Sequence, residues 1–150
     1  MKYLKHILIC FFISTAFLSN AQEELTWKDL EDVKYTKDFD PDHNMVFYYP
    51  DFGENIKTKE GSEVYIKGFL VPIDMEDGLF ALSLTPYKSC FFCGKSGPET
   101  VIQLNMSSKR RYLGLKMDKV LTFKGTLKLN SDNELDLIYI LEDAEMYYGK

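Results

Sequence analysis

The pattern of apolar and polar residues predicts a β protein from residue 63 onward. Residues 120–129 alternate leucine and phenylalanine with threonine and lysine, and residues 135–141 continue the alternation after a Ser-Asp-Asn turn. A period of two places the apolar side chains on one face of a strand. Three further runs, rich in valine, isoleucine, leucine and aromatic residues, bring the number of predicted strands to five; they lie at 63–72, 79–85 and 101–106.

Gly68 interrupts the first of these predicted strands. A glycine inside a strand often marks a bend or bulge where the chain turns a barrel corner. Five strands with the first one bent are typical of an oligonucleotide/oligosaccharide-binding (OB) type barrel, and a short β-sandwich is the competing architecture. The fold class that we expect is mainly β: a five-stranded OB-like barrel over residues 61–150, preceded by a short N-terminal helix.

The N-terminal extension, residues 22–60, begins with the signals of a short helix. Thr26 is suited to cap the first turn of a helix that starts at Trp27, and Asp29 is the acidic residue three positions after the cap. A hydroxyl and a carboxylate at this spacing satisfy the free N–H groups at a helix start. We therefore expect a capped helix that packs on the barrel.

The rest of this extension is expected to contain a loop and one strand. Residues 35–43 are polar and acidic and predict a loop. Residues 45–49 are apolar and aromatic and predict a strand that stops at Pro50, because proline has no N–H to donate to a strand ladder.

Residues 1–21 have the three-part layout of a secretory signal peptide. Lys2 and Lys5 supply the positive start, residues 7–18 are mostly apolar, and small residues surround a cleavage site after Ala21. The apolar stretch is shorter than the ~20 residues that span a bilayer, so we expect cleavage rather than a membrane anchor. The sequence thus predicts export to the periplasm or the extracellular space, with no membrane span after cleavage.

Composition narrows the classes of function. The chain has 150 residues and a formal net charge of −5; loss of the signal leaves 129 residues with a charge of −7, because two lysines and no acid leave with it. This length predicts a single domain. An acidic balance argues against a nucleic-acid partner, since binding to phosphates needs a surplus of lysine and arginine. The predicted mature protein keeps one histidine, His43, and one pair of cysteines.

The paired cysteines, Cys90 and Cys93, carry the main candidate chemistry. With Phe91 and Phe92 between them they form a CxxC motif in the loop between the second and third predicted barrel strands. Exported thiols tend to be oxidised, so one interpretation is a local structural disulfide. Its ring is short, and the stabilisation should lie below the ~3 kcal/mol expected for a fifteen-residue loop.

A second interpretation is a soft-metal site, with zinc as the metal. Structural zinc needs four ligands, and Cys90 and Cys93 supply two. His43 and Glu99 are the candidates to complete the site within the chain, and a homodimer that pairs two such loops is the other route.

A third interpretation is a periplasmic thiol-disulfide oxidoreductase. Cys90 would be the attacking thiol and Cys93 would resolve the mixed disulfide. Such sites place the first cysteine at a helix start, which lowers the pKa of its thiol. Here the flanking elements are predicted strands, and Gly94 and Pro98 argue against a helix after the motif.

Five short segments between Trp27 and Leu141 carry a resemblance to a known family. They are Gly68-Phe69-Leu70-Val71-Pro72, Phe80-Ala81-Leu82, Cys90, Gly97-Pro98-Glu99 and Val101-Ile102. Together they resemble an uncharacterised family of small secreted bacterial proteins that is defined only as a domain of unknown function. The resemblance implies an exported or periplasmic location and an OB-like barrel, and it supplies no reaction.

The function that we expect is that of a secreted, non-enzymatic binding or accessory module. Its paired-cysteine loop would be a structural disulfide or a zinc site, and this function assigns no catalytic residue. The alternative function is that of an oxidoreductase, in which Cys90 and Cys93 are the catalytic residues. An envelope protein or a second copy of the chain is the expected kind of partner. Oligosaccharide binding follows from the fold by analogy alone.

Overall fold

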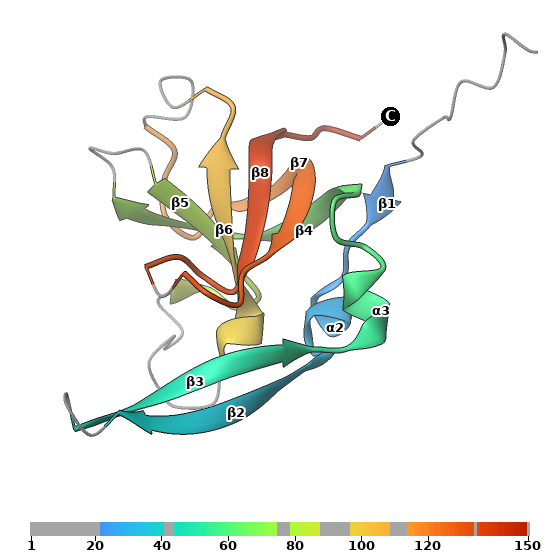
Figure 1. Cartoon of the computed structure of the whole chain (residues 1–150). Helices are drawn as coiled ribbons and strands as arrows, with labels where there is room; N and C mark the ends of the chain where they lie inside the picture. Colours follow the sequence, from blue (N-terminus) through green and yellow to red (C-terminus); the bar gives the residue numbers. More distant parts are fainter. Residues whose placement is uncertain are drawn as a thin grey trace, which may run out of the picture.

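The computed structural model describes residues 22–40, 44–74, 79–87, 97–108, 114–133 and 135–149 (Figure 1). The predicted signal peptide, residues 1–21, lies outside these residues, as do His43, Cys90 and Cys93. None of the helices in the described ranges combines the length and the apolar character that a membrane crossing requires.

Five strands form a closed barrel. They are β4 (Glu63–Asp74), β5 (Leu79–Ser83), β6 (Val101–Met106), β7 (Val120–Leu129) and β8 (Tyr139–Met146). Their order is β4-β5-β6-β8-β7, and the pairing of β7 with β4 closes the ring. All of these pairs are antiparallel except β6–β8, which is parallel. A closed five-stranded mixed barrel with this order is OB-like, so the predicted fold class is confirmed.

The predicted barrel strands agree with the observed ones wherever the alternation is regular. β6 and β7 have the predicted bounds, and β4 continues two residues beyond the predicted end. The last strand was predicted to begin at residue 135, but β8 begins at Tyr139 and extends to Met146. Residues 135–138 belong instead to the loop between β7 and β8, which the side chains of that loop hold together.

Gly68 lies where β4 changes its partner strand. Residues 63–69 pair with β7, and β5 pairs with β4 from Phe69 onward. A Cβ at Gly68 would lie 2.8 Å from the Trp27 ring and 2.9 Å from the carbonyl oxygen of Ser83. The glycine therefore allows the backbone to approach both groups, which explains why no side chain fits there, while the bend itself stays a prediction.

Two short helices lie together at one end of the barrel (Figure 1). They are α2 (Trp27–Leu30) and α3 (Glu54–Lys57), and each contributes one fully buried residue to the core, Leu30 and Ile56. The short strand β1 (Glu23–Glu24) precedes them and pairs in parallel with β4. The helices thus cover apolar surface that the barrel strands alone would leave exposed.

The predicted capping box at the start of α2 is confirmed. The Asp29 N–H donates to the Thr26 hydroxyl at 3.3 Å, and the Thr26 N–H donates to the Asp29 carboxylate at 2.8 Å. Burial acts to raise the pKa of Asp29, but the hydrogen bonds from Thr26 outweigh it and hold that pKa below its ordinary value.

The start of α3 is capped from another element. Its N-cap residue is Gly53, which has no side chain to accept a hydrogen bond. The Asp32 carboxylate takes this role, accepting from the N–H groups of Asn55 at 3.0 Å and Ile56 at 3.2 Å. A Cβ at Gly53 would collide with this carboxylate, so the glycine is what lets Asp32 reach the helix.

A two-stranded antiparallel hairpin lies beside the barrel (Figure 1). It consists of β2 (Val33–Asp40) and β3 (Met45–Phe52). The predicted loop over residues 35–43 is therefore wrong for residues 35–40, because pairing with β3 overrides their polar composition. The predicted stop at Pro50 is also wrong: Pro50 continues the strand opposite Tyr35, at a position where its missing N–H need not face the partner.

Tyr139 on β8 joins the barrel to both N-terminal elements. Its side chain is fully buried, and its hydroxyl donates to the Leu30 carbonyl oxygen of α2 at 2.8 Å. Its ring packs against that of Phe52 at the end of β3, with 5.5 Å between the centroids. Burial, followed by the charges of Asp32 and Glu99, raises the pKa of Tyr139, so its hydroxyl stays neutral.

Replacing Tyr139 with phenylalanine should lower the free energy of unfolding by about 1–3 kcal/mol at pH 7, because the buried Leu30 carbonyl loses its donor. The raised pKa also makes a pH-dependent contribution to stability. This contribution is fully present below the unfolded tyrosine pKa of about 10 and is lost as the pH rises through the folded value. Urea denaturation from pH 8 to pH 11 should therefore show a shallower loss of stability for Tyr139→Phe than for the wild type. Equal slopes would contradict this assignment.

Candidate functional site

The outer face of β5 and β6 is buried. The residues that alternate with the core positions on these strands should face outward, yet they are almost inaccessible: Ala81 is 2% exposed, Ser83 1%, Val101 6% and Gln103 4%. OB-type barrels commonly bind their ligands on this face and on the adjoining loops. In this protein the outward residues of β5 and β6 are covered, so this part of the sheet surface is not open to a ligand.

The loop between β7 and β8 covers β6 and is held there by Gln103. The Gln103 amide nitrogen donates to the Asp136 carboxylate at 2.8 Å, and the Gln103 carbonyl oxygen accepts from the Leu137 N–H at 3.0 Å. The same amide nitrogen donates to the Asn105 side chain at 3.1 Å. A buried amide is stable only when its donors and acceptors are satisfied, and here the loop satisfies them.

Asn130 holds the same loop from within. Its side-chain nitrogen donates to the carbonyl oxygens of Asn133 at 2.7 Å and Leu137 at 3.2 Å, and its side-chain oxygen accepts from the Asn133 N–H at 3.0 Å. The Asn133 side chain in turn donates to the Asp136 carboxylate at 2.7 Å. The loop is thus a rigid, hydrogen-bonded unit rather than an extended strand, which explains why β8 starts late.

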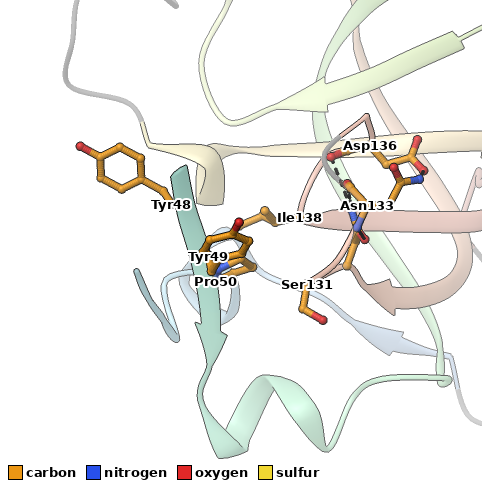
Figure 2. Close-up of a pocket in the computed structure, with 8 residues that line it drawn as sticks. Tyr48, Tyr49, Pro50, Ser131, Asn133, Asp136 and Ile138 are labelled. Carbon is orange, nitrogen blue, oxygen red and sulfur yellow. Dashed lines mark hydrogen bonds between the residues drawn. The ribbon is translucent and has the colours of Figure 1, made fainter. Parts of the chain in front are cut away.

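A cleft of about 330 Å³ separates this loop from the hairpin strand β3. Figure 2 shows Tyr49, Pro50 and Ile138 close together, Asn133 and Asp136 on the other side, and the Tyr48 ring extending away from them. The residues that line the cleft are Tyr48, Tyr49, Pro50, Asn130, Ser131, Asn133, Asp136 and Ile138. The cleft therefore has one apolar, aromatic wall and one polar wall.

The polar wall keeps capacity to accept hydrogen bonds from a ligand. From the described residues, each Asp136 oxygen accepts one hydrogen bond, whereas a carboxylate offers about four acceptor positions. The Ser131 hydroxyl donates to the Asp132 carboxylate at 2.8 Å and can itself accept. Among the described residues that line the cleft there is no histidine, cysteine or lysine. This donor and acceptor set is suited to holding a ligand through hydrogen bonds.

A second contact ties the hairpin to the segment before β6. Tyr35 on β2 donates its hydroxyl to the Glu99 carboxylate at 3.0 Å, and Glu99 belongs to the short 3-10 helix η3 (Pro98–Thr100). Burial, together with the neighbouring Glu99 carboxylate, raises the pKa of Tyr35. A Cβ at Gly97 would collide with the Glu99 carboxylate, so Gly97 gives this side chain its room.

Of the four predicted metal ligands, only Glu99 lies among the residues that the structure describes. Glu99 is described, and one of its oxygens is already bound to Tyr35. His43, Cys90 and Cys93 lie outside the described residues. Within the described ranges, no group of three or more histidine, cysteine, aspartate or glutamate side chains is arranged to hold a metal ion. The cysteine-based site therefore stays a prediction.

Comparison with known proteins adds no name to this geometry. No protein-family model, no curated protein and no solved structure matches the chain. The function proposed below therefore depends on the cleft and on the chemistry of its lining.

The sequence pattern did not reveal the cleft. The sequence predicts the Ser-Asp-Asn turn, but it places Asp136 and Ile138 in a strand, and it indicates no role for Tyr49 beyond that of a strand residue before Pro50. The available signal was the density of asparagine, aspartate and serine over residues 130–136, which is typical of a self-bonded loop rather than a strand.

Asn130→Ala should lower the free energy of unfolding by about 1–2 kcal/mol, because it removes three part-buried hydrogen bonds that hold the backbone of the loop. Asn55→Ala is the matched control, since the Asn55 side chain is exposed on α3 and should change stability by less than about 0.5 kcal/mol. Urea denaturation of both variants measures the difference. Similar stability for the two variants would contradict the role assigned to Asn130.

Proposed function

We propose that this protein is an exported, non-enzymatic binding module that holds one small ligand in the cleft between β3 and the β7–β8 loop. The observation that carries the proposal is the pairing of an aromatic wall, formed by Tyr49 and Pro50, with the acceptors of Asp136 and Ser131. A volume of about 330 Å³ lies at the lower end of the ~300–1,000 Å³ typical of ligand pockets. The ligand is therefore compact.

The lining favours a saccharide over other compact ligands. A sugar ring has one face of C–H groups, which packs on an aromatic ring, and a rim of hydroxyl groups, which donate to carboxylate and hydroxyl acceptors. The Asp136 carboxylate and the acidic net charge of −5 disfavour anionic ligands, including nucleic acids. A neutral or amino sugar fits both walls.

The rigidity of the loop supports binding without catalysis. Gln103 and Asn130 fix the polar wall before a ligand arrives, and Tyr139 fixes the hairpin that carries the aromatic wall. A preorganised site loses less side-chain entropy on binding.

The paired cysteines form the second part of the proposal. Cys90 and Cys93 lock the loop between β5 and β6 as a disulfide, or hold zinc with His43 and Glu99 as further ligands. The contact between Tyr35 and Glu99 supports a role for this region in joining the hairpin to the barrel. The resemblance to the family of small secreted bacterial proteins and the export signal belong to the same proposal.

The cleft predicts a difference between two neighbouring tyrosines. Tyr49→Thr should weaken the binding of a responsive sugar by about tenfold, because it removes the aromatic wall while a β-branched residue keeps the strand. Tyr48 also lines the cleft, but its ring extends away from the other lining residues (Figure 2), so Tyr48→Thr should weaken binding less than Tyr49→Thr. Isothermal titration with neutral and amino monosaccharides and disaccharides measures both. Failure of the wild type to bind any of them, or equal loss in both variants, would contradict the proposed ligand class.

Each proposed state of the cysteine pair gives the protein a different mass. Native mass spectrometry of the purified protein, with and without a chelator, should show either the loss of both thiol hydrogens or a zinc increment that disappears in Cys90→Ser. Thiol titration distinguishes the disulfide from free cysteines. Turnover of a model disulfide that vanishes in Cys90→Ser would contradict the non-enzymatic function and favour an oxidoreductase.

A further inference from the structure

The hairpin has unpaired strand edges, whereas the barrel closes on itself. Among the described residues, β2 pairs only with β3, and the two form a sheet of their own. In Figure 1 the β2 edge lies on the side of the hairpin away from the barrel. An exposed edge presents a row of N–H and C=O groups that can pair with another chain.

Pro50 determines which β2 residues direct their backbone groups to this edge. Pro50 lies opposite Tyr35 and has no N–H, so this pair is one of the non-hydrogen-bonded pairs of the ladder. The register between β2 and β3 has no bulge, so every second residue behaves in the same way. Tyr35, Lys37 and Phe39 therefore direct their N–H and C=O groups away from β3.

Two of the four charges along β2, those of Lys34 and Asp38, are complementary about Thr36. Lys34 and Asp38 lie two residues to either side of it, and both side chains are exposed. In an antiparallel pair with a two-fold axis at Thr36, Lys34 of each strand lies opposite Asp38 of the other strand, which gives two pairs of opposite charges. Opposite charges at facing positions stabilise a strand pair, whereas like charges destabilise it.

The same axis also satisfies the backbone and the apolar side chains. It places Tyr35 opposite Lys37, and both carry outward-directed backbone groups. It places Phe39, whose side chain is 57% exposed, opposite Val33. An axis at Lys34, Lys37 or Asp38 would instead place a residue opposite its own like charge.

We propose that this protein forms a two-fold homodimer in which the β2 strands of two copies pair antiparallel about Thr36. The two hairpins then form one continuous four-stranded sheet, with the tip of each hairpin beside the base of the other. The pairing covers a single strand edge, which is smaller than the ~1,200–2,000 Å² of a stable interface, so the dimer is weak and depends on concentration. Formation of the dimer leaves the cleft on the opposite edge, beside β3, open to its ligand.

Analytical ultracentrifugation over a range of protein concentrations tests this arrangement. The wild type should show a concentration-dependent dimer that weakens at high salt. Lys34→Asp should raise the dimer dissociation constant by at least about tenfold, because two like-charge pairs replace two attractive ones. The double variant Lys34→Asp/Asp38→Lys should restore the dissociation constant to within about threefold of the wild type.

Lys67→Asp is the matched control, because it makes the same change of charge at an exposed position on β4. It should leave the dissociation constant unchanged, and circular dichroism should show that all variants are folded. A wild type that stays monomeric at every concentration would overturn the proposal, and the mixed charges of β2 would then serve to keep this edge unpaired. An equal effect of Lys67→Asp, or no restoration in the double variant, would also overturn it.

Discussion

The hydrogen bond from the Tyr139 hydroxyl to the Leu30 carbonyl is the contact on which the rest of the arrangement depends. The barrel closes through its own strand pairs, but in the part of the chain that the structure describes no strand pair joins it to the hairpin β2–β3. Tyr139 supplies that connection with one side chain, because its hydroxyl binds α2 and its ring packs on Phe52 at the end of β3. The position of β3, and with it one wall of the cleft, follows from this buried contact.

The second determinant of the arrangement is the rigid loop between β7 and β8, which covers a sheet surface that would otherwise be open. Gln103 would be an ordinary outward residue of β6, yet the loop between β7 and β8 folds over it and satisfies its amide. Burying an amide is costly unless its partners are present, so the amide and the loop depend on each other. Within the described residues no buried side-chain nitrogen or oxygen lacks a partner. As a result, the face that OB-type barrels commonly use for binding is covered, and a cleft lies at its border.

Local sequence signals predicted the elements whose stability is local. The regular alternation of residues 120–129 and the capping box of Thr26 each specify a geometry within a few residues, and both predictions were confirmed. The predictions failed for the segments whose structure depends on residues far away in the sequence. β2 carries two lysines and two aspartates, and it becomes a strand because β3 pairs with it, while Pro50 is tolerated because its position in the ladder needs no N–H.

The sequence by itself thus determined the mainly β class and the capped helix, because periodicity and capping act over short distances along the chain. Only the tertiary structure decided the late start of β8, the covered face of β6 and the cleft. Asp136 lies 33 residues from Gln103, and Tyr139 lies 109 residues from Leu30. Hydrogen bonds between residues so far apart produce no periodic pattern in the sequence. Many polar residues could form them, and the partners are decided only when the folded chain brings two of them within reach.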